Sequence, residues 1–320
     1  MKALVYHEFG GPDVLRVEEM DKPVPTAGQV LLRVRAAGLN PLDWRMMHGE
    51  PRAIARFAFK IPAAGTIPGR DVAGVVEAVA PDVTQLKVGD EVFGVCPGAC
   101  AQYALARATK LVAKPVNVSF EQAGGVGVAG LTALQGLRDY GQLQARQKLL
   151  INGAAGGVGT FAVQIAKALG ADVTAVCRTD KVELVRSLGA DRVIDYTRED
   201  FTREKNHYDV VLDNVGNHPA SVLRHLVKRQ GVCVVAGAPK EPSLVLKRLA
   251  SALAIKPFVS QRIRIFIAKA RPADLAALQD LMATGKLTPV VDRVYPLDEA
   301  RAAFAYLEEG HARGKVIVAP

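Results

Sequence analysis

The sequence predicts an α/β fold in two parts, an irregular β-barrel and a doubly wound parallel sheet. In the first third, Pro and Gly divide the chain into short apolar segments, for example at residues 10–12 and 67–69, which is typical of many short strands. From about residue 120 onward, β-branched apolar segments alternate with segments of helical spacing, which is typical of a parallel sheet covered by helices. A glycine-rich segment at residues 151–159 joins one such strand to the next helix.

The predicted barrel strands come first. Residues 30–36 alternate between apolar and polar side chains as a half-buried strand does, and residues 72–79 form a second candidate. Residues 92–94 follow a Gly89-Asp90 turn and make a third.

The second part begins where Ser119 and Gln122 form a capping box that starts a helix. Buried strands are expected at residues 148–152, 172–177, 193–195, 210–213 and 232–236. Helices are expected at residues 160–169 and 182–188, each followed by a glycine. Two further helices, at residues 272–284 and 298–308, precede a last strand at residues 315–318.

Composition limits the class of protein. The 320 residues are 49% apolar and 23% charged, which fits two folded domains of ordinary size. The net charge of +9 attracts anions in general, but the basic residues form no long run, so we expect no nucleic-acid partner. Four cysteines without CxxC spacing predict neither a disulfide framework nor structural zinc. With no long apolar run and no signal-peptide pattern, we expect no membrane segment and a cytoplasmic location.

The strongest local signal is the GxxGxxG spacing of Gly153, Gly156 and Gly159 between a strand and a helix. Such a turn lets a pyrophosphate approach bare backbone, and the helix N-terminus offers it unpaired N–H groups. The context on both sides predicts a dinucleotide site whose loop residues are Ala155, Gly156, Gly157 and Val158.

The end of the next strand indicates which dinucleotide binds. A site for NAD usually has an acid about 20 residues after the glycines, to hold the ribose 2′-hydroxyl. Here Cys177 and Arg178 stand there, followed by Thr179 and Lys181, and this combination favours the 2′-phosphate of NADPH. Asp180 is a counter-argument that lies past the strand end, and the alternative is that both cations are solvated surface charges.

Two later strand ends complete the predicted site. Asn214 follows the strand at residues 210–213, and Gly237 follows the strand at residues 232–236. Ligands of open parallel sheets bind at the carboxyl ends of the strands, so both residues are candidates for the nicotinamide side. The alternative for each is a plain structural turn.

These motifs together resemble the zinc-free branch of the medium-chain dehydrogenase/reductase superfamily. The chain is similar to the quinone oxidoreductases and the reticulon-interacting mitochondrial oxidoreductases over essentially residues 1–320. The matching segments are residues 36–45 (AAGLNPLDWR), 68–74 (PGRDVAG), 129–134 (AGLTAL), the glycine loop, 189–196 (GADRVIDY) and 310–316 (GHARGKV). The resemblance implies a GroES-like barrel at residues 1–122, completed by residues 263–320. It also implies a Rossmann NADPH-binding domain at residues 123–262, and a homodimer.

The resemblance also assigns roles to single residues. Thr132 is expected to contact the nicotinamide end. Arg178, Lys181 and Tyr196 are expected to surround the 2′-phosphate, while Arg313 and Lys315 reach the cofactor from the C-terminal segment.

The positions that hold zinc in the alcohol dehydrogenases have changed here. Asn40 and the pair Arg70-Asp71 occupy the places of a Cys and a His–Glu pair, and neither an amide nor a guanidinium replaces those ligands. We therefore expect no metal, and direct hydride transfer from NADPH to a small electron-poor acceptor such as a quinone or an α,β-unsaturated carbonyl. Asn40 is a candidate to donate a hydrogen bond to the acceptor, and Asp43 is a candidate for the proton path. The alternative is that Asn40 only fixes its loop.

Two other classes of function stay open at this point. One is an NADPH-binding sensor or structural protein with little turnover, which differs from the reductase only in its acceptor pocket. The other is RNA binding, which is compatible with the net charge but is supported by no motif.

Overall fold

Both ends of the chain contribute strands to one sheet. The computed structural model describes residues 1–49, 65–237 and 261–320. Within them the chain forms two units, Met1–Leu131 with Ala270–Pro320, and Thr132–Lys269. Each unit has an apolar core of its own, and the predicted fold class is confirmed.

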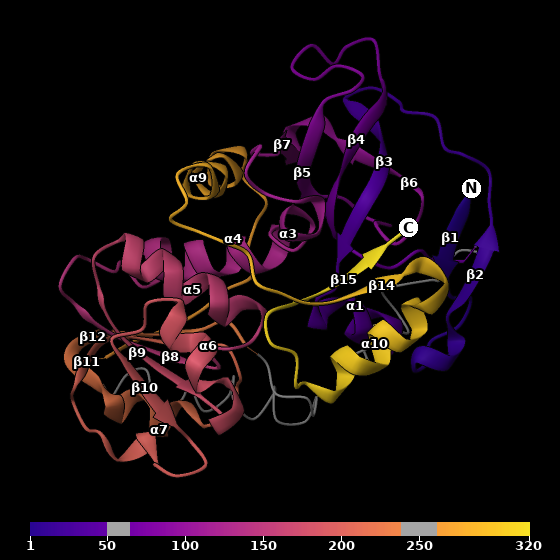
Figure 1. The fold of residues 1–320 in the computed structure, drawn as a ribbon. Coiled ribbons are helices and arrows are strands. Elements are labelled where there is room, and N and C mark those ends of the chain that lie inside the picture. Colours follow the sequence, from indigo (N-terminus) through magenta and orange to yellow (C-terminus); the bar gives the residue numbers. More distant parts are fainter. Residues whose placement is uncertain (50–64, 238–260) are drawn as a thin grey trace. The chain divides into compact units, whose positions relative to one another are not determined.

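The first unit is built on a seven-stranded sheet. Its order is β14 (Val291–Pro296), β15 (Lys315–Ala319), β3 (Gln29–Gly38), β4 (Asp71–Val79), β5 (Glu91–Val95) and β7 (Leu111–Ala113), and β6 (Tyr103–Arg107) also pairs with β3. Strand β15 pairs antiparallel with β3, placing Ile317 opposite Gly38. The yellow C-terminal strand therefore lies beside the N-terminal strands within this unit (Figure 1).

Shorter elements complete the first unit. Strands β1 (Lys2–Val5) and β2 (Arg16–Glu19) form a separate antiparallel pair. Its helices are α1 (Pro41–Met47), α3 (Phe120–Gly124), α9 (Pro272–Ala283) and α10 (Ala300–Glu309). The predicted capping box is confirmed, because Ser119 and Gln122 exchange hydrogen bonds at the start of α3. Helix α10 ends at Gly310, which adopts the left-handed conformation that glycine tolerates best.

The second unit is a six-stranded parallel sheet. Its order is β10 (Arg192–Asp195), β9 (Asp172–Cys177), β8 (Lys148–Asn152), β11 (Tyr208–Asp213), β12 (Val227–Val235) and β13 (Arg262–Ile265). Helices α5 (Gly157–Ala168), α6 (Val182–Ser187) and α7 (Ala220–Leu226) pack against it (Figure 1). The chain order reverses direction between β8 and β11, and this switch point is where such sheets bind ligands.

Helix α4 (Gly127–Gln135) spans the boundary between the units and is followed by a turn of π-helix at Gly136–Tyr140. No helix in the described ranges is long and apolar enough to cross a bilayer.

Candidate functional site

The glycine loop has the backbone geometry that a phosphate site requires. Gly153 leaves β8 with a φ of +78°, a conformation that favours glycine. A Cβ on Gly159 would lie 2.1 Å from the carbonyl oxygen of Gly153, so this glycine allows helix α5 to approach the turn. A Cβ on Gly156 would meet nothing closer than 3.6 Å. Gly156 is the N-cap of α5, so the open space lies beside the unpaired N–H groups of the first helical turn.

A buried amide lies next to this loop. Both polar atoms of the Asn214 side chain, Oδ1 and Nδ2, are buried and find no hydrogen-bond partner among the described residues. The Asn214 Cβ lies 3.7 Å from where a Cβ on Gly153 would be. A Cβ on Gly237 would come within 2.2 Å of the Asn214 backbone, so only glycine fits there. Buried amides are almost always hydrogen-bonded, so this one fits a polar ligand bound beside the loop.

The polar side chains next to Asn214, those of Asn152 and Asp213, do have hydrogen-bond partners. Asn152 donates from Nδ2 to Asp213 Oδ1 at 2.8 Å and to Asn217 Oδ1 at 3.0 Å. Asp213 also accepts from the backbone N–H groups of Val215 and Gly216. These bonds fix the turn after β11, and they leave both polar atoms of the Asn214 side chain without a partner among the residues that the structure describes.

The residues predicted for the 2′-phosphate gather at the ends of β9 and β10. Arg178 caps a short 3-10 turn, Thr179–Lys181, that follows β9 directly. Tyr196 follows β10 and is 54% exposed. Thr179 donates from Oγ1 to Asp195 Oδ2 at 2.6 Å, which ties the two strand ends together. Burial, with Asp195 nearby, raises the pKa of the Cys177 thiol to about 11, so this cysteine is no nucleophile.

Sequence reasoning set Asp180 aside, but the structure brings it into direct contact with Arg178. The guanidinium donates from Nε and Nη2 to the two carboxylate oxygens of Asp180, at 2.7 and 3.2 Å. The sequence held a signal for this ion pair, because a basic and an acidic residue two positions apart in a tight turn are within reach of each other.

A second cluster lies inside the first unit, where Asn40, Asp71 and Lys315 are each at most 3% exposed. The Lys315 ammonium donates to Asn40 Oδ1 at 2.6 Å, to the Leu39 carbonyl at 2.9 Å and to Asp71 Oδ2 at 3.1 Å. All three donors of this ammonium are thus used within the barrel unit. Arg313, two residues earlier, is exposed, and its backbone N–H donates to Asp292.

The Asn40 side chain is fully engaged in this cluster. Besides accepting from Lys315, it donates from Nδ2 to Asp71 Oδ2 at 3.0 Å and to the Gly38 carbonyl at 3.3 Å. The geometry supports the interpretation in which Asn40 fixes the loop before α1, because neither amide hydrogen is left for a substrate.

Asp43 lies beside this cluster and is 4% exposed. It accepts from the Asn40 backbone N–H at 2.8 Å, which completes a capping box at the start of α1. Burial, together with the charge of Asp71, raises the pKa of Asp43 to about 7, against the opposing effects of Lys315 and Arg70. A carboxyl with this pKa holds and releases a proton near neutral pH.

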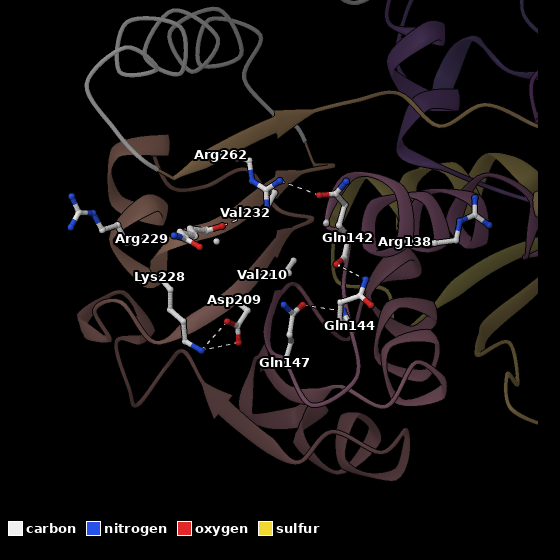
Figure 2. Close-up of a pocket in the computed structure, with 13 residues that line it drawn as sticks. Arg138, Gln142, Gln144, Gln147, Asp209, Val210, Lys228, Arg229, Val232 and Arg262 are labelled. Carbon is white, nitrogen blue, oxygen red and sulfur yellow. Dashed lines mark hydrogen bonds and ion pairs between the residues drawn. The ribbon is translucent and has the colours of Figure 1, made fainter.

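A separate polar hollow of about 820 Å³ lies at the opposite, amino-terminal edge of the parallel sheet (Figure 2). Its acid, Asp209, is paired with Lys228 at 2.8 and 2.9 Å, and Arg262 donates to Gln142. None of the predicted site residues lines it. Volume alone therefore does not locate the candidate site, whereas the strand ends and the glycine loop do.

Whether the protein could hold a metal ion depends on which side chains are grouped as possible ligands. In the described part of the chain, no three His, Cys, Asp or Glu side chains are grouped as metal ligands would be. Asp71 and Arg70 stand where the alcohol dehydrogenases have zinc ligands. The Asp71 carboxylate accepts hydrogen bonds from the Lys315 ammonium and the Asn40 amide. The Arg70 guanidinium donates to Met46 Sδ at 3.2 Å.

Comparison with known proteins gives consistent matches along the chain. The model of the alcohol dehydrogenase GroES-like domain matches residues 26–135, and that of the zinc-binding dehydrogenase family matches residues 188–318. A chloroplastic NADPH-dependent alkenal/one oxidoreductase of Arabidopsis thaliana is 36% identical over 100% of this chain and 80% of its own length. A chloroplastic quinone-oxidoreductase homolog of Spinacia oleracea is 31% identical over 100% of this chain and 98% of its own length.

Solved structures agree with these relatives. The quinone oxidoreductase from Coxiella burnetii superposes with a TM-score of 0.86 at 29% identity, covering 100% of this chain and 99% of its own. A mycobacterial protein complexed with NADPH superposes with a TM-score of 0.83 at 26% identity, covering 100% of both chains.

Proposed function

Because the chain belongs to the quinone oxidoreductase branch of the medium-chain dehydrogenase/reductase superfamily, we propose that it is an NADPH-dependent oxidoreductase acting on quinones or α,β-unsaturated carbonyls. The observation that carries the proposal is the glycine loop at the sheet's switch point, with an unpartnered buried amide, Asn214, beside it. Two relatives whose names state an NADPH-dependent alkenal or a quinone reaction support the acceptor class.

The chain's own residues fit the cofactor. Of the loop residues, Ala155, Gly157 and Val158 would present backbone N–H groups to the pyrophosphate, and Gly156, whose own N–H donates to the Gly153 carbonyl at 3.3 Å, would leave room for it. Arg178, Thr179, Lys181 and Tyr196 would hold the 2′-phosphate at the ends of β9 and β10.

The nicotinamide end meets a different set of residues. Thr132, Asn214 and Gly237 would hold it, and Asn214 would gain there the hydrogen bonds that it otherwise lacks. The resemblance to the superfamily also supports Arg313 as a cofactor ligand, whereas Lys315 is bonded within the barrel unit, where it supports the Asn40 loop. The bound cofactor supplies the hydride, and the protein supplies binding and orientation.

The reaction needs no metal. The Asp71 carboxylate is neutralised by Lys315, and Asn40 and Arg70 offer no ligand that zinc prefers. The acceptor is instead already electron-poor, and reduction of a quinone or an enone requires one proton besides the hydride. Asp43, with its pKa of about 7, holds that proton, and Asn40 positions Asp43 through the capping box.

The test follows the loss of nicotinamide absorbance with 9,10-phenanthrenequinone, 1,4-benzoquinone, an alkenal and a simple ketone, with NADPH and NADH in parallel. Turnover of a quinone or the alkenal with a preference for NADPH is expected. Turnover of the simple ketone alone would contradict the acceptor class. NADPH binding without any turnover would instead indicate a sensor or structural protein.

The assembly and the location of the protein are also proposals. The resemblance to its superfamily supports a homodimer, which sedimentation equilibrium tests. All four cysteines are free and buried, which supports a reducing compartment such as the cytoplasm. The relatives above are chloroplastic, so fractionation of cells decides the location.

A further inference from the structure

The predicted phosphate-binding arginine is already bonded to a carboxylate. Arg178 and Asp180 form a two-point ion pair with side chains that are 42% and 33% exposed. A guanidinium binds a carboxylate and a phosphate through the same fork of N–H groups. Asp180 therefore occupies the Nε–Nη2 fork of Arg178, through which the guanidinium would also bind a 2′-phosphate.

The other acidic residue at these strand ends, Asp195, is hydrogen-bonded to two threonines of the neighbouring turns. Asp195 accepts from Thr179 Oγ1 through Oδ2, and from the Thr197 N–H and hydroxyl through Oδ1 at 3.0 and 2.8 Å. These contacts make Asp195 part of the turn after β10. Of the predicted phosphate ligands, Asp195 thus holds only the Thr179 hydroxyl, whereas Asp180 is bonded to the guanidinium that is predicted to bind the phosphate.

We propose that Asp180 is a specificity-determining residue that competes with the 2′-phosphate for Arg178 and so reduces the preference for NADPH over NADH. The inference rests on the proposed function, because it takes the ends of β9 and β10 as the adenosine site. When NADPH binds, Arg178 leaves Asp180 and turns to the phosphate. When NADH binds, the ion pair stays closed, because NADH has no 2′-phosphate to compete for the guanidinium.

The size of the effect follows from the exposure of the pair. Ion pairs at this degree of exposure change an equilibrium constant by roughly two- to five-fold. Asp180→Asn removes this competition, so NADPH affinity should rise by about that factor at low salt while NADH affinity stays within about 1.5-fold. The gain should shrink at high ionic strength, because exposed charges are screened.

The chain offers a closely matched control. Arg138 donates from Nε and Nη2 to the two carboxylate oxygens of Asp139 at 2.6 and 3.1 Å, with side chains 39% and 26% exposed. Arg138 lines the polar hollow at the other edge of the same sheet (Figure 2). Asp139→Asn opens a pair of the same geometry and changes the net charge equally, and it should leave the preference between the cofactors unchanged.

The experiment measures dissociation constants of the full chain by titration calorimetry for NADPH and NADH. Adenosine 2′,5′-bisphosphate and AMP serve as probes of the adenosine end alone. The same titrations are made with Asp180→Asn, Asp139→Asn, Arg178→Gln and the double variant Arg178→Gln/Asp180→Asn. In the Arg178→Gln background the effect of Asp180→Asn should fall below about 1.5-fold, because its partner is gone.

The outcomes separate this inference from the proposed function. An unchanged cofactor preference in Asp180→Asn, while the wild type binds NADPH, would overturn the inference alone. A gain of equal size in the Arg178→Gln background would also overturn it, because Asp180 would then act without Arg178. A wild-type protein that binds neither NADPH nor the bisphosphate would refute the proposed function itself.

Discussion

The Lys315–Asp71 pair allows a sharp test of how the barrel unit is stabilised. Lys315→Met removes the ammonium and leaves a carboxylate that is 0% exposed. Breaking a buried pair in this way costs about 3–5 kcal/mol. The lower end applies here, because Asp71 keeps hydrogen bonds from Asn40 Nδ2 at 3.0 Å and from the Val128 backbone N–H at 2.6 Å. In a unit of this size, about 3 kcal/mol corresponds to a drop in melting temperature of roughly 6–12 °C.

Differential scanning calorimetry and denaturant titration measure this change. Lys22→Met is the control, because Lys22 pairs with Glu77 at 2.7 Å but the two side chains are 42% and 32% exposed. Solvent screens that exposed pair, so the control should melt within about 4 °C of the wild type. Asp71→Asn in the Lys315→Met background should recover part of the loss, because it removes the unpaired charge. If Lys315→Met has the same melting temperature as the control, the ammonium does not stabilise the fold by neutralising the buried Asp71 carboxylate.

Three further predictions concern the loop, the adenosine end and the proton site. Gly156→Ala should leave stability unchanged and weaken NADPH binding. Gly159→Ala should destabilise the fold by about 1–3 kcal/mol, since its Cβ meets backbone at 2.1 Å. Equal melting temperatures of the two variants would contradict this. Arg178→Ala with Lys181→Ala should weaken NADPH binding at least ten-fold and NADH binding little, in the same titrations, and equal losses would refute the 2′-phosphate assignment. The native pKa of Asp43, about 7, lies above its ordinary 3.8, so the folded state holds an extra proton between these values and stability falls as pH rises through them. Asp43→Asn should flatten this fall of about 2–3 kcal/mol between pH 5 and 7 in denaturant titrations.

The parallel sheet was predictable because its strands are buried on both faces. Strand β9, DVTAVC, is a short β-branched apolar run, and such runs stand out in a sequence without any knowledge of their neighbours. The two-stranded pair of β1 and β2 and the edge strand β13 were missed for the opposite reason. Strand β13 reads RIRI and has mostly exposed side chains, so only its pairing with β12 makes it a strand.

The candidate site likewise has a part that the sequence predicts and a part that it does not. The glycine loop was predictable because its geometry is set by consecutive residues. The Lys315 cluster was not, because Asn40 lies 275 residues from Lys315 and Asp71 lies 244 residues from it. The sheet order β15–β3–β4 brings the three together. A usable signal existed in the pattern, since Lys315 opens an apolar strand and Asp71 opens another, and a charge at such a position needs a partner.

Asp71 links the stability of the barrel unit to its proposed chemistry. Its oxygens accept from Lys315, from Asn40 and from the backbone of Val128, so one carboxylate joins β4 to β15, to the loop before α1 and to the start of α4. The same charge raises the pKa of Asp43, while Lys315 lowers it. Replacing a buried ion pair by apolar residues of similar volume is often neutral or stabilising. Here, such a replacement would also remove both charges that act on Asp43, so the barrel cannot exchange this pair for a simpler core without changing the proton site.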